Sequence, residues 1–178
     1  FANNMAEVLK HPTSIFALLG MIILIGVLIK IRKVKIDTRM VTQIGVALAL
    51  ATVLKVFRLY HLPQGGSITL GSMIPILLMA FLYGPEVGYL TGFLYGIITL
   101  VMDPFIVHPV QVLFDYPLPF MALGLAGHFQ DRKMLGTTVA IIARFLCHFI
   151  SGFVFFGSYA PKGMSPYIYS LWINGVFM

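Results

Sequence analysis

The 178-residue sequence is 59% hydrophobic, carries only 10% charged residues and has a mean hydropathy of +0.94. Soluble domains carry about 25% charged residues, so this composition excludes a water-soluble enzyme, a nucleic-acid-binding protein and a disordered chain. The excess of basic over acidic residues, 12 against 6, is instead typical of membrane topology signals and of contact with anionic lipid headgroups. The length fits one membrane domain, and the single cysteine, Cys147, excludes an internal disulfide.

The first predicted membrane helix covers residues 14–31, because about 20 apolar residues are needed to span a bilayer. Five basic residues lie in the linker 30–39, whereas Lys10 alone precedes the helix, which is the opposite order to that of a secretion signal. We therefore expect residues 1–36 to form an N-terminal anchor helix and a basic cytoplasmic linker. Residues 37–178 form the main membrane domain.

Six further apolar segments follow the anchor helix, separated by stretches rich in glycine and proline. They cover residues 38–58, 72–82, 86–102, 109–129, 136–156 and the run that starts at Pro166. The last run has 13 residues, about 20 Å of helix, so we expect its remainder to lie beyond the sequence. The chain is predicted to be an all-α integral membrane protein.

The distribution of Lys and Arg predicts how these helices are oriented. The linker 30–39 carries five of them and should be cytoplasmic, and alternation then places the turns at 84–85 and 130–133 on the same side. Three long loops are predicted to lie together outside the cell, at residues 59–71, 103–109 and 157–165.

Ionisable side chains inside membrane segments are the first candidate functional residues, because burying a charge in lipid is costly. Asp115 lies six residues into its segment, and Arg144 and His148 are spaced i,i+4 on one helix face. Lys55 lies near a helix end, where its long side chain can reach the interface, so no functional role is expected for it. A purely structural pair, Asp115 with Arg144 or His148, stays open as an alternative to a ligand site.

Aromatic and amide side chains on the same outer half would complete a pocket around Asp115 and His148. They are Tyr116, Phe156, Tyr159, Tyr169 and Asn174. An interfacial aromatic belt explains any one of these aromatic residues alone, but their grouping favours a pocket. A carboxylate with aromatic walls suits a cationic heteroaromatic ligand.

Small residues repeat at i,i+4 along two segments, a pattern that lets membrane helices approach closely. The glycine repeat of residues 88–96 predicts packing inside the bundle. The pairs Gly45 with Ala49 and Ala47 with Ala51 either pack inside or dock a partner helix, and the sequence leaves both readings open.

Several catalytic and metal-binding motifs are missing from the sequence. It contains no phosphate-binding loop, no zinc-protease motif and no Cys/His cluster with metal spacing, so we expect no metal and no cofactor. Nothing pairs Asp115 and His148 with a nucleophile. An intramembrane enzyme that uses these two residues is therefore the weaker functional class.

Four stretches resemble the bacterial thiamine transporter family. They are residues 63–70 (PQGGSITL), 108–118 (HPVQVLFDYPL), 144–152 (RFLCHFISG) and 155–166 (FFGSYAPKGMSP), the last followed by 169–175 (YSLWING). Members of this family are substrate-binding S components of energy-coupling factor (ECF) transporters. The resemblance covers residues 38–178 and implies a six-helix S-component bundle, to which the N-terminal helix is an addition.

The resemblance also implies a high-affinity thiamine pocket that faces the outside of the cell and is covered by the loop after the first family helix. Asp115 would be the acidic residue that faces the ligand. The other implied ligand-binding residues are Tyr116, His148, Gly152, Phe156, Tyr169 and Asn174. Among them, His148 and Phe156 would pack on the ligand rings, and Gly152 would allow close approach of the ligand.

The resemblance implies partners as well. Ala47 and Ala51 would face a shared transmembrane coupling subunit, and two separate ATPase subunits would drive uptake. Three alternatives stay open: a solitary proton-coupled carrier of thiamine or a related vitamin or precursor, an intramembrane enzyme, and a purely structural membrane subunit.

Overall fold

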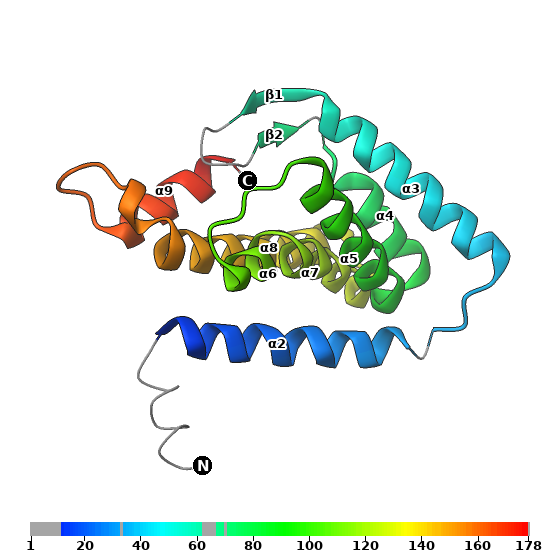
Figure 1. Ribbon diagram of the computed structural model, residues 1–178. Helices are drawn as coiled ribbons and strands as arrows, with labels where there is room; N and C mark the ends of the chain where they lie inside the picture. The colour runs from blue at the N-terminus through cyan, green and yellow to red at the C-terminus, as the bar shows by residue number, and fades with distance from the viewer. Residues whose placement is uncertain (1–11, 33, 62–66, 70, 178) are drawn as a thin grey trace, which may run out of the picture.

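The structure is a computed structural model that describes residues 12–32, 34–61, 67–69 and 71–177. Its elements are, in chain order, α2 (Pro12–Ile31), α3 (Thr38–Val56), β1 (Arg58–His61), β2 (Ser67–Thr69), α4 (Ile74–Tyr83), α5 (Pro85–Met102), α6 (Pro109–Asp115), α7 (Pro117–Ala122), the 3-10 helix η1 (Leu123–Phe129), α8 (Lys133–Phe155), the 3-10 turn η2 (Gly157–Tyr159) and α9 (Pro166–Phe177). Figure 1 shows the helices packed lengthwise, with the hairpin β1–β2 at one end.

Five segments are long and apolar enough to cross a membrane. They are Thr13–Ile31, Thr38–Val56, Pro85–Met102, Pro109–Phe129 and Lys133–Phe155. α4 is apolar but shorter, with 10 residues. The prediction of an all-α membrane protein is confirmed, with the short antiparallel hairpin as the one addition among the described residues.

Local sequence signals explain where several helices begin. The carboxylate of Asp37 accepts a hydrogen bond from the backbone N–H of Met40 at 2.7 Å, which caps the start of α3. Pro85 occupies the first turn of α5, where its missing N–H costs nothing. Gly84 separates α4 from α5 with φ +90°, a conformation that favours glycine.

The prediction of one continuous helix over 109–129 is wrong. The segment is broken into α6, α7 and η1, and the first break falls between Asp115 and Pro117. Proline has no backbone N–H and its ring clashes with the carbonyl four residues earlier, so Pro117 and Pro119 interrupt the helical hydrogen bonds. The predicted helix end at Arg58 and the loop 59–71 also differ, because Arg58 already pairs with Thr69 in the hairpin.

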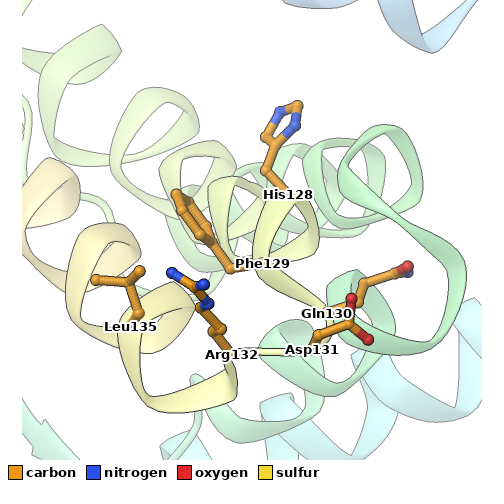
Figure 2. A pocket seen from close by; sticks show the side chains of 6 residues that line it. All are labelled: His128, Phe129, Gln130, Asp131, Arg132 and Leu135. Atoms are coloured by element: carbon orange, nitrogen blue, oxygen red, sulfur yellow. The ribbon is translucent and has the colours of Figure 1, made fainter.

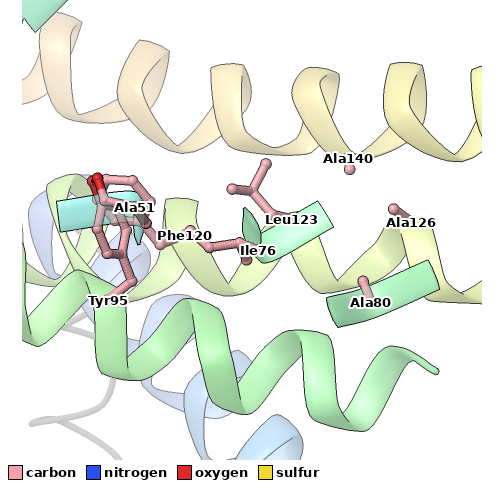
Figure 3. Close-up of a cluster of buried hydrophobic side chains, with 8 residues drawn as sticks. All are labelled: Ala51, Ile76, Ala80, Tyr95, Phe120, Leu123, Ala126 and Ala140. Carbon is pink, nitrogen blue, oxygen red and sulfur yellow. The ribbon is translucent and has the colours of Figure 1, made fainter. Parts of the chain in front are cut away.

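Glycines let the middle helices touch backbone to backbone. A Cβ on Gly92 would lie 2.1 Å from the carbonyl oxygen of Phe120, and one on Gly88 would lie 2.8 Å from the Cα of Gly124. The prediction that this glycine repeat packs inside the bundle is confirmed. A buried apolar cluster continues the contact, made by Ala51, Ile76, Ala80, Tyr95, Phe120, Leu123, Ala126 and Ala140 (Figure 3).

The prediction that Ala47 and Ala51 face a partner helix is wrong. Ala47 is 9% exposed and Ala51 is fully buried, because this face of α3 packs on α4 and α5 of the same chain. The other small pair, Gly45 and Ala49, is exposed, and nothing lies within 4 Å of a Cβ built on Gly45.

The N-terminal helix α2 packs on α5 and α6 and touches α8 through one ring contact. A Cβ on Gly20 would lie 2.9 Å from side-chain atoms of Leu113 and Phe114. The rings of Phe16 and Phe153 meet edge to face at 5.8 Å. The rest of α2 is largely exposed, in keeping with a lipid-facing helix.

The described parts of the three loops that were predicted to share one side lie at one end of the bundle. Arg58 Nη1 of β1 lies 3.0 Å from Asp103 Oδ2, and the ring of Phe105 stacks on that of Phe156. We call this the hairpin end; in Figure 1 the hairpin lies at the top, and the loop between α8 and α9 lies at the left. The turn at Gly84 and the turn that follows η1 lie at the opposite end, where Gly127 approaches Pro85.

Candidate ligand-binding site

Asp115 is the last residue of α6, and its side chain is only 18% exposed. Its Oδ1 lies 3.4 Å from His148 Nδ1 of α8, and its Oδ2 accepts a hydrogen bond from Gln111 Nε2 at 2.5 Å. The helix break at Pro117 therefore leaves a carboxylate near the hairpin end, held between two elements. The structure pairs Asp115 with His148 rather than with Arg144.

Tyr116, the residue at the break, has a buried ring whose hydroxyl is fully used within the chain. It accepts from the backbone N–H of Phe105 at 2.8 Å and donates to the carbonyl of Asp103 at 2.9 Å. Tyr116 therefore fixes the path of residues 103–105 after α5. It acts on the site through this loop and does not present a free hydroxyl.

Gln111 was not identified from the sequence, yet it lies at the centre of the polar contacts. Its side chain is 1% exposed, its Oε1 accepts from the N–H of Val107 at 3.1 Å, and its Nε2 donates to the carbonyl of Phe105 at 3.1 Å as well as to Asp115. The spacing of four residues to Asp115 on one helix was the available signal.

Asn174, Ser170 and Gly152 join α9 to α8. Asn174 Nδ2 donates to the carbonyls of His148 at 3.2 Å and of Ser170 at 2.9 Å, and Ser170 Oγ donates to the carbonyl of Phe149 at 2.8 Å. A Cβ on Gly152 would lie 2.2 Å from Ser170 Oγ. The space beside Gly152 is thus filled by α9, so this glycine permits a helix contact in the structure, where close approach of a ligand was expected.

Aromatic rings line the site at the hairpin end. Phe156 stacks on Phe105 at 5.8 Å with 27° between the ring planes, and Tyr159 follows at 5.9 Å from Phe156. Tyr169 is buried, with 8% exposure, but among the described residues its side chain makes no hydrogen bond to Asp115 or His148. The rings of Phe156 and Tyr159 are therefore in direct contact, whereas Tyr169 is a buried side chain of α9 without a polar contact to Asp115 or His148.

Two basic side chains point into the bundle. The guanidinium carbon of Arg144 lies 4.5 Å from the ring centroid of Phe120, and its Nε and Nη1 are buried without a hydrogen-bond partner among the described residues. The expectation that Lys55 reaches the interface is wrong, because it is 6% exposed. Lys55 follows Ala47 and Ala51 at i,i+4 spacing, so it shares their inward face of α3.

A hollow of about 240 Å³ lies at the opposite end of the molecule (Figure 2). It is lined by His128, Phe129, Gln130, Asp131, Arg132 and Leu135. These residues come from the end of η1, the turn that follows it and the first turn of α8, and most of them are exposed. The hollow is therefore separate from the polar contacts around Asp115.

The arrangement around Asp115 is chemically suited to a flat cation. Burying a carboxylate costs free energy unless a positive charge and hydrogen bonds replace the lost water. Gln111 supplies one of these hydrogen bonds but no positive charge. His148 and the stacked rings of Phe105 and Phe156 offer faces on which an aromatic cation can lie.

Comparison with known proteins gives consistent matches. The family described as thiamine transporter protein matches residues 41–178. The thiamine transporter ThiT of Bacillus subtilis is 36% identical over an alignment of 155 residues, and the match covers 76% of this chain and 80% of that protein. ThiT of Lacticaseibacillus paracasei is 32% identical over an alignment of 123 residues, and that match covers 58% of this chain and 61% of that protein.

A solved structure has the same fold. ThiT from Listeria monocytogenes superposes with a TM-score of 0.67 at 22% identity, covering 78% of this chain and 85% of that one. The matched family region begins within α3, so α2 precedes it. With its several apolar helices and this family match, the chain is a multi-pass membrane protein that belongs to the thiamine transporter protein family.

Proposed function

We propose that the chain is the substrate-binding S component of an ECF transporter, and that it binds thiamine with high affinity at the site around Asp115. The observation that carries the proposal is the Asp115–His148 contact, in which both side chains are four-fifths buried, within a segment of the family match. Thiamine carries a permanently charged thiazolium ring, and a desolvated carboxylate attracts a cation far more strongly than an exposed one does.

The geometry around this pair supports recognition of the rings as well as of the charge. Asp115 Oδ1 is only loosely engaged, at 3.4 Å from His148, so a ligand cation can compete for it. Phe156 and the His148 imidazole offer ring faces for stacking. The finer assignment of Tyr169 and Asn174 to the ligand stays a prediction, with the Asn174 Nδ2 atom already used between α8 and α9.

The direction of binding follows from charge. Residues 30–39 and 130–133, at the end opposite the hairpin, hold seven of the 12 Lys and Arg residues, and such residues favour the cytoplasm. The hairpin end, with Arg58 of β1 tied to Asp103, would then face outside and cover the entry to the site.

Partners supply the energy in this proposal. The sequence holds no phosphate-binding loop, so ATP hydrolysis would come from two ATPase subunits joined through a transmembrane coupling subunit. Because Ala47 and Ala51 are internal, the contact for that subunit moves to the exposed face of α3 that carries Gly45 and Ala49. Small exposed residues let a second helix approach closely.

The test is titration of the purified protein with thiamine by isothermal calorimetry. We expect Asp115→Asn to weaken binding by at least about 100-fold, because leaving a buried ionic partner unpaired costs about 3–5 kcal/mol. Asp131→Asn, in the exposed turn at the opposite end, is the matched control and should bind like the wild type. Equal affinity of Asp115→Asn and wild type would refute the proposal.

A solitary proton-coupled carrier is the competing function, because Asp115 and His148 are two titratable groups in contact. Liposomes that contain this chain alone separate the two functions. Thiamine accumulation driven by a pH gradient, without ATPase subunits, would favour the carrier; binding without accumulation is what the proposed function predicts.

A further inference from the structure

The buried amide of Gln111 joins the loop after α5 to the carboxylate at the end of α6. Its side chain is 1% exposed and makes three hydrogen bonds, two to the backbone of residues 105–107 and one to Asp115. A buried amide with all of these bonds made is rigidly held, because breaking any of them leaves a polar group without a partner.

The hydrogen-bond partners determine which way this amide points. The backbone N–H of Val107 can only donate, so the atom facing it must be the oxygen Oε1. The carbonyl of Phe105 can only accept, so Nε2 faces it and also faces Asp115. Gln111 can therefore only donate to the carboxylate of Asp115.

The same bonds divide the two carboxylate oxygens between different roles. Oδ2 is engaged by Gln111 at 2.5 Å, while Oδ1 lies at the longer distance of 3.4 Å from His148 Nδ1. Phe105, whose carbonyl Gln111 also holds, carries the ring that stacks on Phe156. Gln111 thus contacts both the carboxylate of Asp115 and the backbone of the loop that carries Phe105.

From this geometry we infer that Gln111 is a positioning residue, which holds Asp115 so that Oδ1 meets the ligand's positive charge and thereby sets selectivity for a cationic ring. The inference rests on the proposed function. It assigns no ligand contact to Gln111 itself. It requires only that the side-chain amide of Gln111 fix the position of the Asp115 carboxylate.

The experiment compares two ligands, thiamine and a neutral isostere in which carbon replaces the charged ring nitrogen. Gln111→Met keeps the side-chain length and removes the donor. We expect it to weaken thiamine binding by about 10-fold or more, the size expected for a charged hydrogen bond, and to change binding of the isostere by less than about 3-fold. Gln130→Met, whose amide binds the Phe81 carbonyl at the opposite end, is the control and should change neither.

A second measurement separates positioning from folding. In the Gln111→Met/Asp115→Asn double variant, thiamine affinity should be no lower than in Asp115→Asn alone, because the amide acts through the carboxylate. Gln111→Asn, with the amide kept but one methylene shorter, should show the same selective loss, and it replaces Gln111→Met if that variant does not fold.

Two results would overturn the inference: equal losses for both ligands, or additive losses in the double variant. Either would make Gln111 a general structural residue. If wild-type protein binds no thiamine, or Asp115→Asn binds like wild type, the proposed function fails instead, so the two failures are distinguishable.

Discussion

The two ends of the bundle are joined by different kinds of contact. Toward the turn at Gly84, α5 meets α7 and η1 through glycines, so closely that no side chain separates Gly92 from the Phe120 carbonyl. Toward the hairpin end, side chains make the joints: Tyr116 and Gln111 hold the loop after α5, and Asn174 holds α9. The glycine contacts can change only by moving whole backbones.

This difference indicates that the glycine contacts serve the stability of the fold and the side-chain contacts serve ligand recognition. Backbone contacts through glycine cannot adjust, because a shift of either helix opens a void or a clash. Side-chain hydrogen bonds can be exchanged for bonds to a ligand at modest net cost. The candidate ligand site therefore lies where the helices are connected by side-chain hydrogen bonds, which a ligand can replace. The glycine contacts hold the remaining helices in fixed positions.

The largest effect is expected from breaking the fixed end. Gly92→Leu would place a Cβ 2.1 Å from the Phe120 carbonyl oxygen, a clash that backbone atoms cannot relieve locally. We expect a loss of more than about 3 kcal/mol in the free energy of unfolding, measured by thermal unfolding in detergent. Gly26→Leu, on the open side of α2, is the control; equal melting temperatures of the two variants would contradict the rigid-frame interpretation.

An intermediate effect is expected where α9 meets α8. Gly152→Ala would place its methyl group 2.2 Å from Ser170 Oγ, which pushes α9 away and strains the bond from Asn174 to the His148 carbonyl. We expect a destabilisation of about 1–3 kcal/mol together with weaker thiamine binding. Adding Ser170→Gly removes the clashing atoms and should restore part of both; no restoration would show that the damage arises elsewhere.

The smallest effect is expected at the hairpin. The Arg58–Asp103 ion pair is about one-third exposed, and such pairs contribute about 1 kcal/mol or less. Arg58→Gln should therefore speed thiamine dissociation by only about 2- to 5-fold at low salt, with little change at high salt because ions screen the pair. Stopped-flow dissociation measures this, with Arg39→Gln as the exposed control. A salt-independent change would argue against the ion pair as its cause.

Much of the fold was predictable because hydrophobic runs of membrane length are a strong signal. The helices near residues 14–31 and 86–102 agree with α2 and α5 within two residues. The break at Pro117 was visible in the sequence, but the apolar run around it favoured one helix. The inward face of α3 was not predictable, because Gly45–Ala49 and Ala47–Ala51 have the same spacing and only the packing of α4 and α5 distinguishes them.

The ionisable residues of the candidate site could be predicted from the sequence, but the residues that hold them in place could not. Asp115 and His148 stand out as ionisable residues within apolar segments, and the structure does bring them together. Gln111 carries no charge, and its partners Phe105 and Val107 lie in a loop whose path depends on Tyr116. The spacing of four residues between Gln111 and Asp115 was visible in the sequence, but the bonds of Gln111 to the loop backbone were not.

The position of α2 beside α6 bears on how a broken helix survives in a bilayer. Hydrocarbon supplies no hydrogen-bond donors, so an interrupted backbone is tolerated at membrane depth only where protein encloses it. At the break, Gly96 of α5 lies against the Tyr116 carbonyl from one side, and α2 packs through Gly20 on Leu113 and Phe114 of α6. The N-terminal helix thus covers Leu113 and Phe114 of α6, directly before the interrupted backbone that bears Asp115.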